Sequence, residues 1–397
     1  MSAVTPQHQP SITSPAGFTA SGVAAGLKAS GALDIALVAN HGPRFDAAGV
    51  FTTNRIQAAP VVWTRQVLKS GKLTAVVLNS GGANACTGPG GFADTHQTAE
   101  HVAELLTCGA GEVAVCSTGL IGERLPMGKL LAGVSSAAAA LTADGGAAAA
   151  HAIMTTDSVS KQALAAGTDK TGVGFLVAGM AKGAGMLAPG LATMLCVITT
   201  DAAVESSVLQ DSLRAACRLT FDRIDSDGCM STNDTVLLLA SGASGAIPDP
   251  ETFAVALRQV CSSLARQLIA DAEGADHEIA VEVVNAATED DAVVVARAVT
   301  RSNLFKCAVT GQDPNWGRVL ASVGTTSANF EPDQLGVAIN GVWVATNGAA
   351  AADRSLVDMS GRQVHVVVDL HAGSASATVW SNDLTAAYVH ENSVYST

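Results

Sequence analysis

The sequence lacks the features that mark secreted, membrane-spanning and nucleic-acid-binding proteins. Its first seventeen residues, MSAVTPQHQPSITSPAG, have neither the basic start nor the apolar stretch of a secretory signal. No uninterrupted apolar run reaches the roughly 20 residues that cross a bilayer as a helix. Basic residues are outnumbered, with 22 Lys and Arg against 35 Asp and Glu, and the net charge of −13 disfavours nucleic acid and anionic membranes. We expect a cytoplasmic protein that binds neither.

The sequence also lacks a metal-binding or redox pattern. None of the eight cysteines stands in a CxxC pair, and His96 and His101 are five residues apart, which is the wrong spacing for joint ligation on one helical face. Most cysteines lie in apolar surroundings typical of reduced core thiols. Only 14% of residues are charged and 48% are hydrophobic, so a chain of 397 residues can form two or three domains with a large core. We expect no metal and no cofactor.

Strands and helices are predicted in alternation along the chain. Short apolar runs predict strands at 49–55, 60–64, 73–78, 112–116, 175–181, 193–200, 236–240, 278–285, 337–344 (with a turn at Gly341), 363–370 and 375–380. Apolar residues at helical spacing predict helices at 95–106, 206–221 and 289–301, and a long helix from Pro250 that Asp249 caps. This mixture predicts an α/β (α+β) fold, with a separate α+β domain after Ala275.

One stretch combines a glycine-rich turn, a Pro-Gly break and a threonine at the start of an apolar run. Lys182–Asp201 reads KGAGMLAPGLATMLCVITTD, and Pro189-Gly190 can continue neither a helix nor a central strand. Thr193 could be an ordinary β-branched residue that opens a core strand. Alternatively, a cut before it would free its α-amine to act as the base for its own hydroxyl, and a strained turn would help that hydroxyl attack the Ala192 carbonyl.

Three other segments have compositions that suit a site. Asn79–Gly88 (NSGGANACTG) is either a backbone-amide cradle or a tight turn, and it lacks the spacing of a Walker A or GxGxxG loop. Thr118-Gly119 follows a predicted strand and could stabilise an oxyanion or form an ordinary turn. Glu273 follows the long helix, where a carboxylate opposes the helix dipole, and is either solvated or a substrate contact.

These segments together resemble the ornithine acetyltransferase (glutamate N-acetyltransferase) family of arginine biosynthesis. Members of that family cut their own chain between the Ala and Thr of an ATML motif, and the new N-terminal Thr then accepts the acetyl group. Two pairs depart from the family pattern: Gly190-Leu191 replaces the usual Asn-Met, and Asp276-His277 replaces the usual Thr-Lys. The resemblance extends from Asn79 to Thr397 and rests on KGAGMLAPGLATML, NSGGANACTG, STGLIG, MTTD, STNDT, DAEGA and TGQDPNWGR.

The resemblance implies a site for acetyl transfer. The chain would be cut between Ala192 and Thr193, with Thr193 as the nucleophile and its α-amine as the base. Thr118 and Gly119 would form the oxyanion hole. The residues implied to bind substrate are Thr155, Lys182, Thr193, Glu273, Asn392 and Thr397.

The implied enzyme is a glutamate N-acetyltransferase, an acyltransferase that moves acetyl from N2-acetyl-L-ornithine to L-glutamate through acetyl-Thr193. It would release L-ornithine and N-acetyl-L-glutamate, and acetyl-CoA as a second donor stays open. Two alternatives also stay open: an N-terminal-nucleophile amidohydrolase or aminopeptidase, and a non-catalytic amino-acid-binding protein.

The resemblance also implies an architecture and an assembly. The expected core is a layered helix–sheet–sheet–helix arrangement, like that of this family and of DmpA-type aminopeptidases. We expect a core domain at 1–201, a joining segment at 202–275, and a domain at 276–397 whose tail returns to the active site. Fragments 1–192 and 193–397 would stay together as an α2β2 assembly without a metal or organic cofactor.

Overall fold

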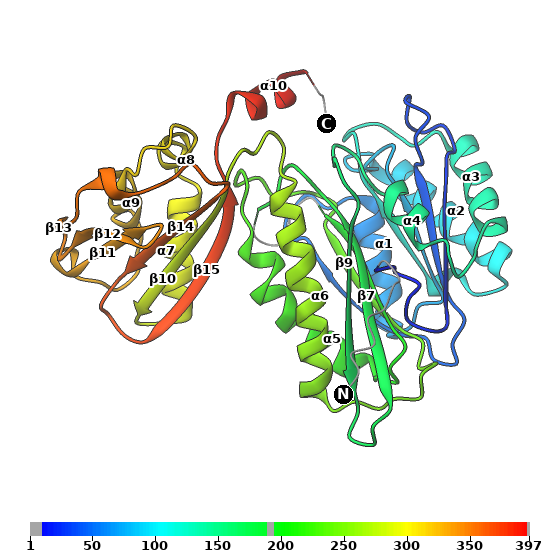
Figure 1. Ribbon diagram of the computed structural model, residues 1–397. Coiled ribbons are helices and arrows are strands. Elements are labelled where there is room, and N and C mark those ends of the chain that lie inside the picture. Colours follow the sequence, from blue (N-terminus) through cyan, green and yellow to red (C-terminus); the bar gives the residue numbers. More distant parts are fainter. Residues whose placement is uncertain (1–9, 189–193, 395–397) are drawn as a thin grey trace.

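The computed structural model describes residues 10–188 and 194–394. Two stacked sheets form the centre of its larger part (Figure 1). The first sheet has the order β1-β2-β4-β5, with β1 at Phe18–Val23, β2 at Ile35–Asn40, β4 at Ala75–Asn79 and β5 at Val113–Ser117. The second has the order β3-β9-β8-β7-β6, with β3 at Asp46–Phe51, β9 at Thr235–Ala240, β8 at Leu195–Thr200, β7 at Gly174–Lys182 and β6 at Lys161–Thr168. The pairs β4–β5 and β8–β9 are parallel and the others antiparallel.

Helices cover the outer faces of both sheets. Apolar side chains of α2 (Gly88–Leu106) and α3 (Met127–Ala139) pack on the first sheet. Side chains of α5 (Ser206–Leu219) and α6 (Pro250–Ala270) pack on the second. A third cluster joins residues of the two sheets to each other, together with the short helix α4 (Gly146–Ala152). The core is therefore a helix–sheet–sheet–helix sandwich, which confirms the predicted fold class.

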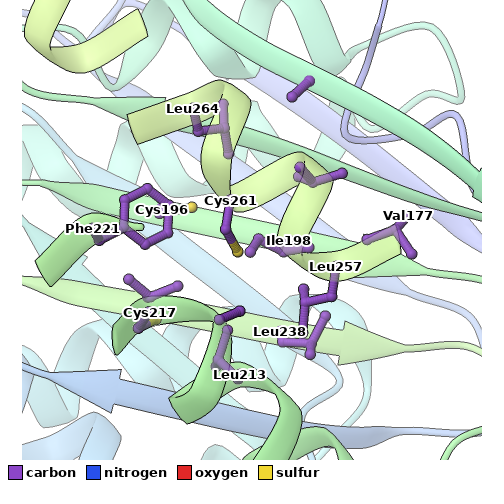
Figure 2. Close-up of a cluster of buried hydrophobic side chains, with 14 of the residues drawn as sticks. Val177, Cys196, Ile198, Leu213, Cys217, Phe221, Leu238, Leu257, Cys261 and Leu264 are labelled. Atoms are coloured by element: carbon purple, nitrogen blue, oxygen red, sulfur yellow. The ribbon is translucent and has the colours of Figure 1, made fainter. Parts of the chain in front are cut away.

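Strand β8 shows why the sequence of this core has continuous apolar runs. Leu195 and Val197 face the first sheet, whereas Cys196 and Ile198 face the helices, and all four are buried. Figure 2 shows Cys196 and Ile198 packed between the strands and the side chains of α5 and α6. A strand buried on both faces needs apolar residues at every position, and each such side chain stabilises the fold by about 1.5–3 kcal/mol.

The long helix α6 begins and ends as its sequence predicts. The Asp249 carboxylate accepts a hydrogen bond from the Thr252 amide, and Pro250 occupies the first turn. Phe253, Leu257 and the following apolar residues at helical spacing are buried. The helix ends at Ala270, so the chain enters the turn that contains Glu273 directly from a well-anchored element.

The strand predicted at 60–64 is wrong, because these residues belong to helix α1 (Ala59–Val67). Pro60 stands in the first turn, where its missing N–H costs nothing. Val61, Thr64 and Val67 lie on one helical face and are buried. The Thr64 hydroxyl donates to the Val115 carbonyl and accepts from the Val115 amide, at 2.8 and 2.9 Å. These two hydrogen bonds attach the helix to β5.

The C-terminal part has its own sheet and core. Its strand order is β13-β12-β11-β14-β10-β15, with β10 at Glu278–Ala286, β11 at Gly336–Ile339, β12 at Val342–Thr346, β13 at Ala349–Ala350, β14 at Gln363–Asp369 and β15 at Ala375–Asn382. Its helices are α7 (Glu289–Thr300), α8 (Asn303–Thr310) and α9 (Trp316–Val323). After β15, helix α10 (Ala386–Val394) leaves this sheet and lies toward the sandwich (Figure 1).

Five short 3₁₀ helices complete the described elements, at Leu68–Ser70, Ala110–Glu112, Phe221–Arg223, Pro332–Gln334 and Arg354–Leu356. In the part of the chain that the structure describes, no helix combines the length and apolar character needed to cross a membrane.

Candidate active site

The site begins where one strand from each sheet ends. Thr118 follows β5 and Lys182 is the last residue of β7. The Lys182 ammonium donates to Thr118 Oγ1 at 3.3 Å, and both side chains are buried. Lys182 also pairs with Leu195 on the neighbouring strand β8. The predicted oxyanion threonine and the predicted substrate lysine are thus in contact, next to the start of β8.

The Thr118-Gly119 turn has a conformation that requires glycine. Gly119 has a φ of +128°, and a Cβ there would lie 2.7 Å from the Gly82 amide nitrogen. The Thr118 amide donates to the Asn79 carbonyl at 2.9 Å, and the Thr118 carbonyl accepts from Gly82 at 3.0 Å. These contacts tie the turn to the Asn79–Gly88 loop and fix the orientation of the Gly119 peptide.

Asn233 secures this loop from the other side. Its side-chain amide donates to the Ala83 carbonyl at 2.6 Å and to the Ser117 carbonyl at 2.8 Å. Asn233 is buried and lies in the STNDT segment that precedes β9. The segment therefore links the two sheets at Ser117, directly before the Thr118-Gly119 turn.

Lys182 is a buried lysine whose pKa lies below its ordinary value, although the surrounding carboxylates oppose that shift. Burial lowers the pKa of its ammonium, whereas Asp157, Asp234 and Glu273 raise that pKa. Lys161 lowers it further. An ammonium in such a poorly hydrated position forms strong charge-assisted hydrogen bonds, so Lys182 suits the binding of a substrate carboxylate.

Thr155 is joined to the Lys182 segment through one carboxylate. The Thr155 amide donates to Asp157 Oδ2 at 2.9 Å, and the Gly183 amide donates to Asp157 Oδ1 at 2.6 Å. The ammonium of Lys161 also donates to Asp157 Oδ1, at 2.6 Å. Asp157 therefore connects the turn that carries Thr155 with the residue directly after Lys182.

Glu273 connects segments from both sides of the predicted cut. Its carboxylate accepts from the Thr156 hydroxyl at 2.7 Å and from the Asn392 side-chain amide at 3.0 Å. Its own amide donates to the Ala184 carbonyl at 2.9 Å. The structure therefore brings the predicted Glu273 and Asn392 into direct contact and places both beside the Lys182–Gly185 turn.

Three predicted site residues lie outside the described residues: Ala192, Thr193 and Thr397. Met194, the residue after Thr193, is the first described residue beyond Ala192 and Thr193. The Met194 amide donates to Asp234 Oδ1 at 3.1 Å, and the Met194 carbonyl accepts from the Thr235 amide at 3.2 Å.

Asp234, the partner of the Met194 amide, is a buried carboxylate. Burial raises its pKa well above the usual value, and Asp234 Oδ2 has no hydrogen-bond partner among the described residues.

The profile of the ArgJ family matches residues 19–397. The chain belongs to the ArgJ family. It is 66% identical over 386 residues to the arginine biosynthesis bifunctional protein ArgJ of Streptomyces coelicolor, a match that covers 97% of this chain and 100% of the relative. It is 57% identical over 392 residues to the protein of the same name from Mycobacterium tuberculosis, covering 97% of this chain and 96% of the relative.

A solved structure is also similar to this ArgJ-family chain: ornithine acetyltransferase complexed with ornithine, from Mycobacterium tuberculosis. It is 58% identical, and the match covers 47% of this chain and 96% of that chain with a TM-score of 0.42. Membership of the family makes this chain an acyltransferase of arginine biosynthesis, which confirms the class of enzyme that the motifs predict.

One of the two departures from the family pattern has a clear structural setting. The His277 ring nitrogen Nδ1 lies 2.8 Å from Asp383 Oδ2, and the amides of Asp276 and His277 both donate to Asp383 Oδ1. The pair therefore joins the start of β10 to Asp383, the residue after β15. The other pair, Gly190-Leu191, lies outside the described residues.

The sequence interpretation missed four buried polar residues of this ArgJ-family site: Asp157, Lys161, Asn233 and Asp234. Asp157 ends the MTTD motif, and the Asn233-Asp234 pair lies within STNDT. Both motifs were recognised, yet only Thr155 received a role. An acidic or amide residue directly after a run of hydroxyl residues was a usable signal, but Lys161 had none because its partners come from distant segments.

A hollow of about 540 Å³ opens beside Thr155. It is lined by Lys28, Ser30, Ala32, Leu33, His151, Met154, Thr155 and Asp157. Among the described residues, no group of three or more His, Cys, Asp or Glu side chains is arranged to hold a metal ion.

Proposed function

We propose that this chain transfers the acetyl group of N2-acetyl-L-ornithine to L-glutamate through an acetyl ester on Thr193, after it has cut itself between Ala192 and Thr193. The observation that carries the proposal is the contact between Lys182 and Thr118 beside the start of β8. Two parts of the chain that are far apart in sequence supply an oxyanion donor and a carboxylate-binding cation at the strand that Thr193 precedes.

In the first half-reaction the Thr193 hydroxyl attacks the acetyl carbonyl carbon, and its α-amine takes the proton. The Thr118 hydroxyl and the Gly119 N–H donate to the oxygen that becomes negative. The carbon–nitrogen bond then breaks, the α-ammonium returns the proton to the leaving amine, and ornithine departs. In the second half the glutamate amine attacks the ester, the α-amine again handles the proton, and N-acetylglutamate leaves with the Thr193 hydroxyl restored.

Substrate binding uses opposite charges for the two ends of an amino acid. Lys182 binds the α-carboxylate, and Glu273 binds the side-chain ammonium of N2-acetylornithine, whose α-nitrogen is an amide. Thr155 and Asn392 contribute hydrogen bonds beside them. Thr193 and Thr397 complete the set of six binding residues. The proximity of Glu273 to Asn392 and to the Lys182 turn supports this assignment.

The proposal includes two fragments, 1–192 and 193–397, that stay together after cleavage. Residues 177–182 of β7 in the first fragment pair with the whole of β8 in the second, which supports non-covalent association. The ion pair between Lys161 and Asp271 also joins the two fragments. An α2β2 assembly in the cytoplasm completes the proposal.

The relatives are named bifunctional, which supports acetyl-CoA as a second acetyl donor to glutamate in this chain as well.

The test is an assay of purified protein with N2-acetyl-L-ornithine and L-glutamate, then with acetyl-CoA and L-glutamate. The expected product in both is N-acetylglutamate, and a denaturing gel should show two fragments, the second beginning with Thr193. Release of free acetate without N-acetylglutamate would identify a hydrolase instead. A single uncut chain without transfer would favour an amino-acid-binding protein.

Replacement of Thr118 by valine should lower kcat by about 10²–10³-fold, because valine has the shape of threonine without the hydroxyl that donates to the oxyanion. The backbone contacts of Thr118 with Asn79 and Gly82 do not depend on the side chain, so the turn should persist. Steady-state kinetics on the cleaved enzyme measures the effect. Thr118→Ser keeps the hydroxyl and is the control, and equal kcat values for the two variants would refute the role.

Replacement of Gly185 by alanine should raise KM for N2-acetylornithine by about tenfold with little loss of stability. A Cβ at Gly185 would lie 2.5 Å from Glu273 Oε2 and 2.8 Å from Oε1. The carboxylate can move aside, but only by leaving Thr156 and Asn392. Gly128→Ala, whose Cβ meets no described atom within 4 Å, is the control. An unchanged KM in Gly185→Ala would contradict the binding role of Glu273.

A further inference from the structure

We propose that Asp157 is a positioning residue that sets the distance between Thr155 and Lys182, the two groups that bind substrate from the first fragment. The inference deepens the proposed function and rests on it. Asp157 itself is buried and is not among the residues that we expect to touch substrate. It acts through the two backbone segments that its carboxylate holds.

The carboxylate of Asp157 serves three donors with two oxygens. Oδ2 accepts from the Thr155 amide at 2.9 Å, and Oδ1 accepts from the Gly183 amide and the Lys161 ammonium, both at 2.6 Å. Thr155 precedes β6, whereas Gly183 follows β7, so no regular backbone pairing fixes these two positions to each other. Asp157 supplies that connection.

The charge of Asp157 is maintained by its surroundings. Burial alone raises the pKa of a carboxyl group, but the ammonium groups of Lys182 and Lys161 and the Gly183 N–H together hold the pKa of Asp157 below its usual value. The carboxylate therefore stays ionised at neutral pH and presents two acceptor oxygens. Both are needed, because all three partners are donors.

Asp271 offers an internal comparison, since it bonds the same Lys161 ammonium from the other fragment. Asp271 Oδ2 accepts from Lys161 at 2.6 Å and from the Ser158 amide at 3.0 Å. Asp271 Oδ1 accepts from the Ser158 hydroxyl. A hydroxyl can either donate or accept, whereas a backbone N–H can only donate.

An Asp→Asn replacement consequently has different effects at the two positions. At Asp271 the new NH₂ group can donate to the Ser158 hydroxyl while the remaining oxygen keeps Lys161 and the Ser158 amide. At Asp157 no orientation of the new amide satisfies all three donors. If the amide oxygen faces Gly183 and Lys161, the NH₂ group faces the Thr155 N–H, which is itself a donor. If the amide is flipped, the NH₂ group faces the Gly183 N–H and the Lys161 ammonium, which are also donors. The charge removed is the same, so only the anchoring of Thr155 and Gly183 distinguishes the variants.

The experiment compares Asp157→Asn with Asp271→Asn in the full-length, self-cleaved enzyme. We expect KM for acetylornithine and glutamate to rise about 10- to 100-fold in Asp157→Asn, the range that follows when a buried donor loses its partner. The kcat of Asp157→Asn and both constants of Asp271→Asn should stay near those of the wild type. Loss of stability alone would lower the amount of active enzyme and leave KM unchanged.

A second measurement is independent of catalysis. Hydrogen exchange resolved to single amides should show lost protection at Thr155 in Asp157→Asn, with protection at Ser158 retained in both variants. If Asp157→Asn does not fold, Asp157→Glu carries the same test, because it keeps the charge and both acceptors but moves them by one methylene.

The outcomes separate the two proposals. A wild-type protein without acetyl transfer would refute the proposed function, while the exchange measurement would still decide whether Asp157 anchors Thr155. An active wild type, together with equal KM values and equal Thr155 protection in Asp157→Asn and Asp271→Asn, would overturn the positioning role.

Discussion

Replacement of Thr193 by alanine should leave the chain as one uncut polypeptide and lower acetyl transfer by more than about 10⁴-fold, as expected when a nucleophile of a covalent mechanism is removed. Alanine has no hydroxyl to attack the preceding carbonyl, so no fragment beginning at position 193 can form. Without the cut, no free α-amine exists at this position to act as base. Both steps of the proposal therefore fail together.

The fold of Thr193→Ala should persist, because the contacts that hold β8 come from its neighbours. Met194 bonds Asp234 and Thr235, and Leu195 pairs with both Lys182 and Thr235. Circular dichroism and the thermal midpoint check the fold, a denaturing gel checks the cut, and N-acetylglutamate formation checks activity. Thr193→Ser keeps a hydroxyl and is the control, which we expect to be cut and active. Acetyl transfer by uncut Thr193→Ala would refute the nucleophile assignment.

Periodicity predicted many individual strands and helices of the core well because these elements are long or buried on both faces, whereas their layered arrangement came from the family resemblance. The run at 193–200 became β8, and the spacing after Asp249 became α6 with the predicted cap. Helix α1 was missed because residues 60–64 (PVVWT) have the β-branched composition of a strand. The contacts that anchor this helix to β5 come from residues about 50 positions away in sequence, such as the bond from Thr64 to Val115.

The candidate site likewise contains residues that could be proposed from the sequence and partners that could not. Thr118-Gly119 and Glu273 could be proposed from their positions after a strand and after a helix, and the resemblance gave them roles. The partners of these residues could not be found by spacing. Thr156 and Glu273 are 117 residues apart, and Glu273 and Asn392 are 119 apart. Such contacts depend on tertiary packing, which short-range patterns do not encode.

Asp157 and Lys161 form an ion pair whose burial could not be predicted from its spacing in the sequence. They are four residues apart, a spacing typical of an exposed helical ion pair, but the structure places Lys161 in a strand with its side chain fully buried. Its second carboxylate partner, Asp271, lies 110 residues later. The pair is therefore a buried junction between the two proposed fragments, which the sequence alone would assign to the surface.

Replacement of Lys161 by methionine should lower the free energy of unfolding by about 3–5 kcal/mol at pH 7, because it leaves buried carboxylates without their shared cation. Methionine fills a similar volume, so the loss reflects the charge more than the packing. Chemical denaturation monitored by tryptophan fluorescence measures the change, in the Thr193→Ala background so that one uncut chain unfolds. Lys170→Met, at a side chain that is 81% exposed, is the control and should change stability little.

The pH dependence of this loss identifies its cause. In the parent protein the pKa of Asp157 is held below its usual value, so Asp157 stabilises the fold above the unfolded pKa of about 3.9 and loses that contribution as the pH falls through the folded value. In Lys161→Met one of the groups that lower this pKa is gone, and burial raises it. Protonation of Asp157 then relieves the repulsion between the carboxylates of Asp157 and Asp271, so the deficit relative to the parent should be largest at neutral pH and shrink toward pH 4. A deficit that is constant across this range would mean that packing, not the unpaired charge, destabilises the variant.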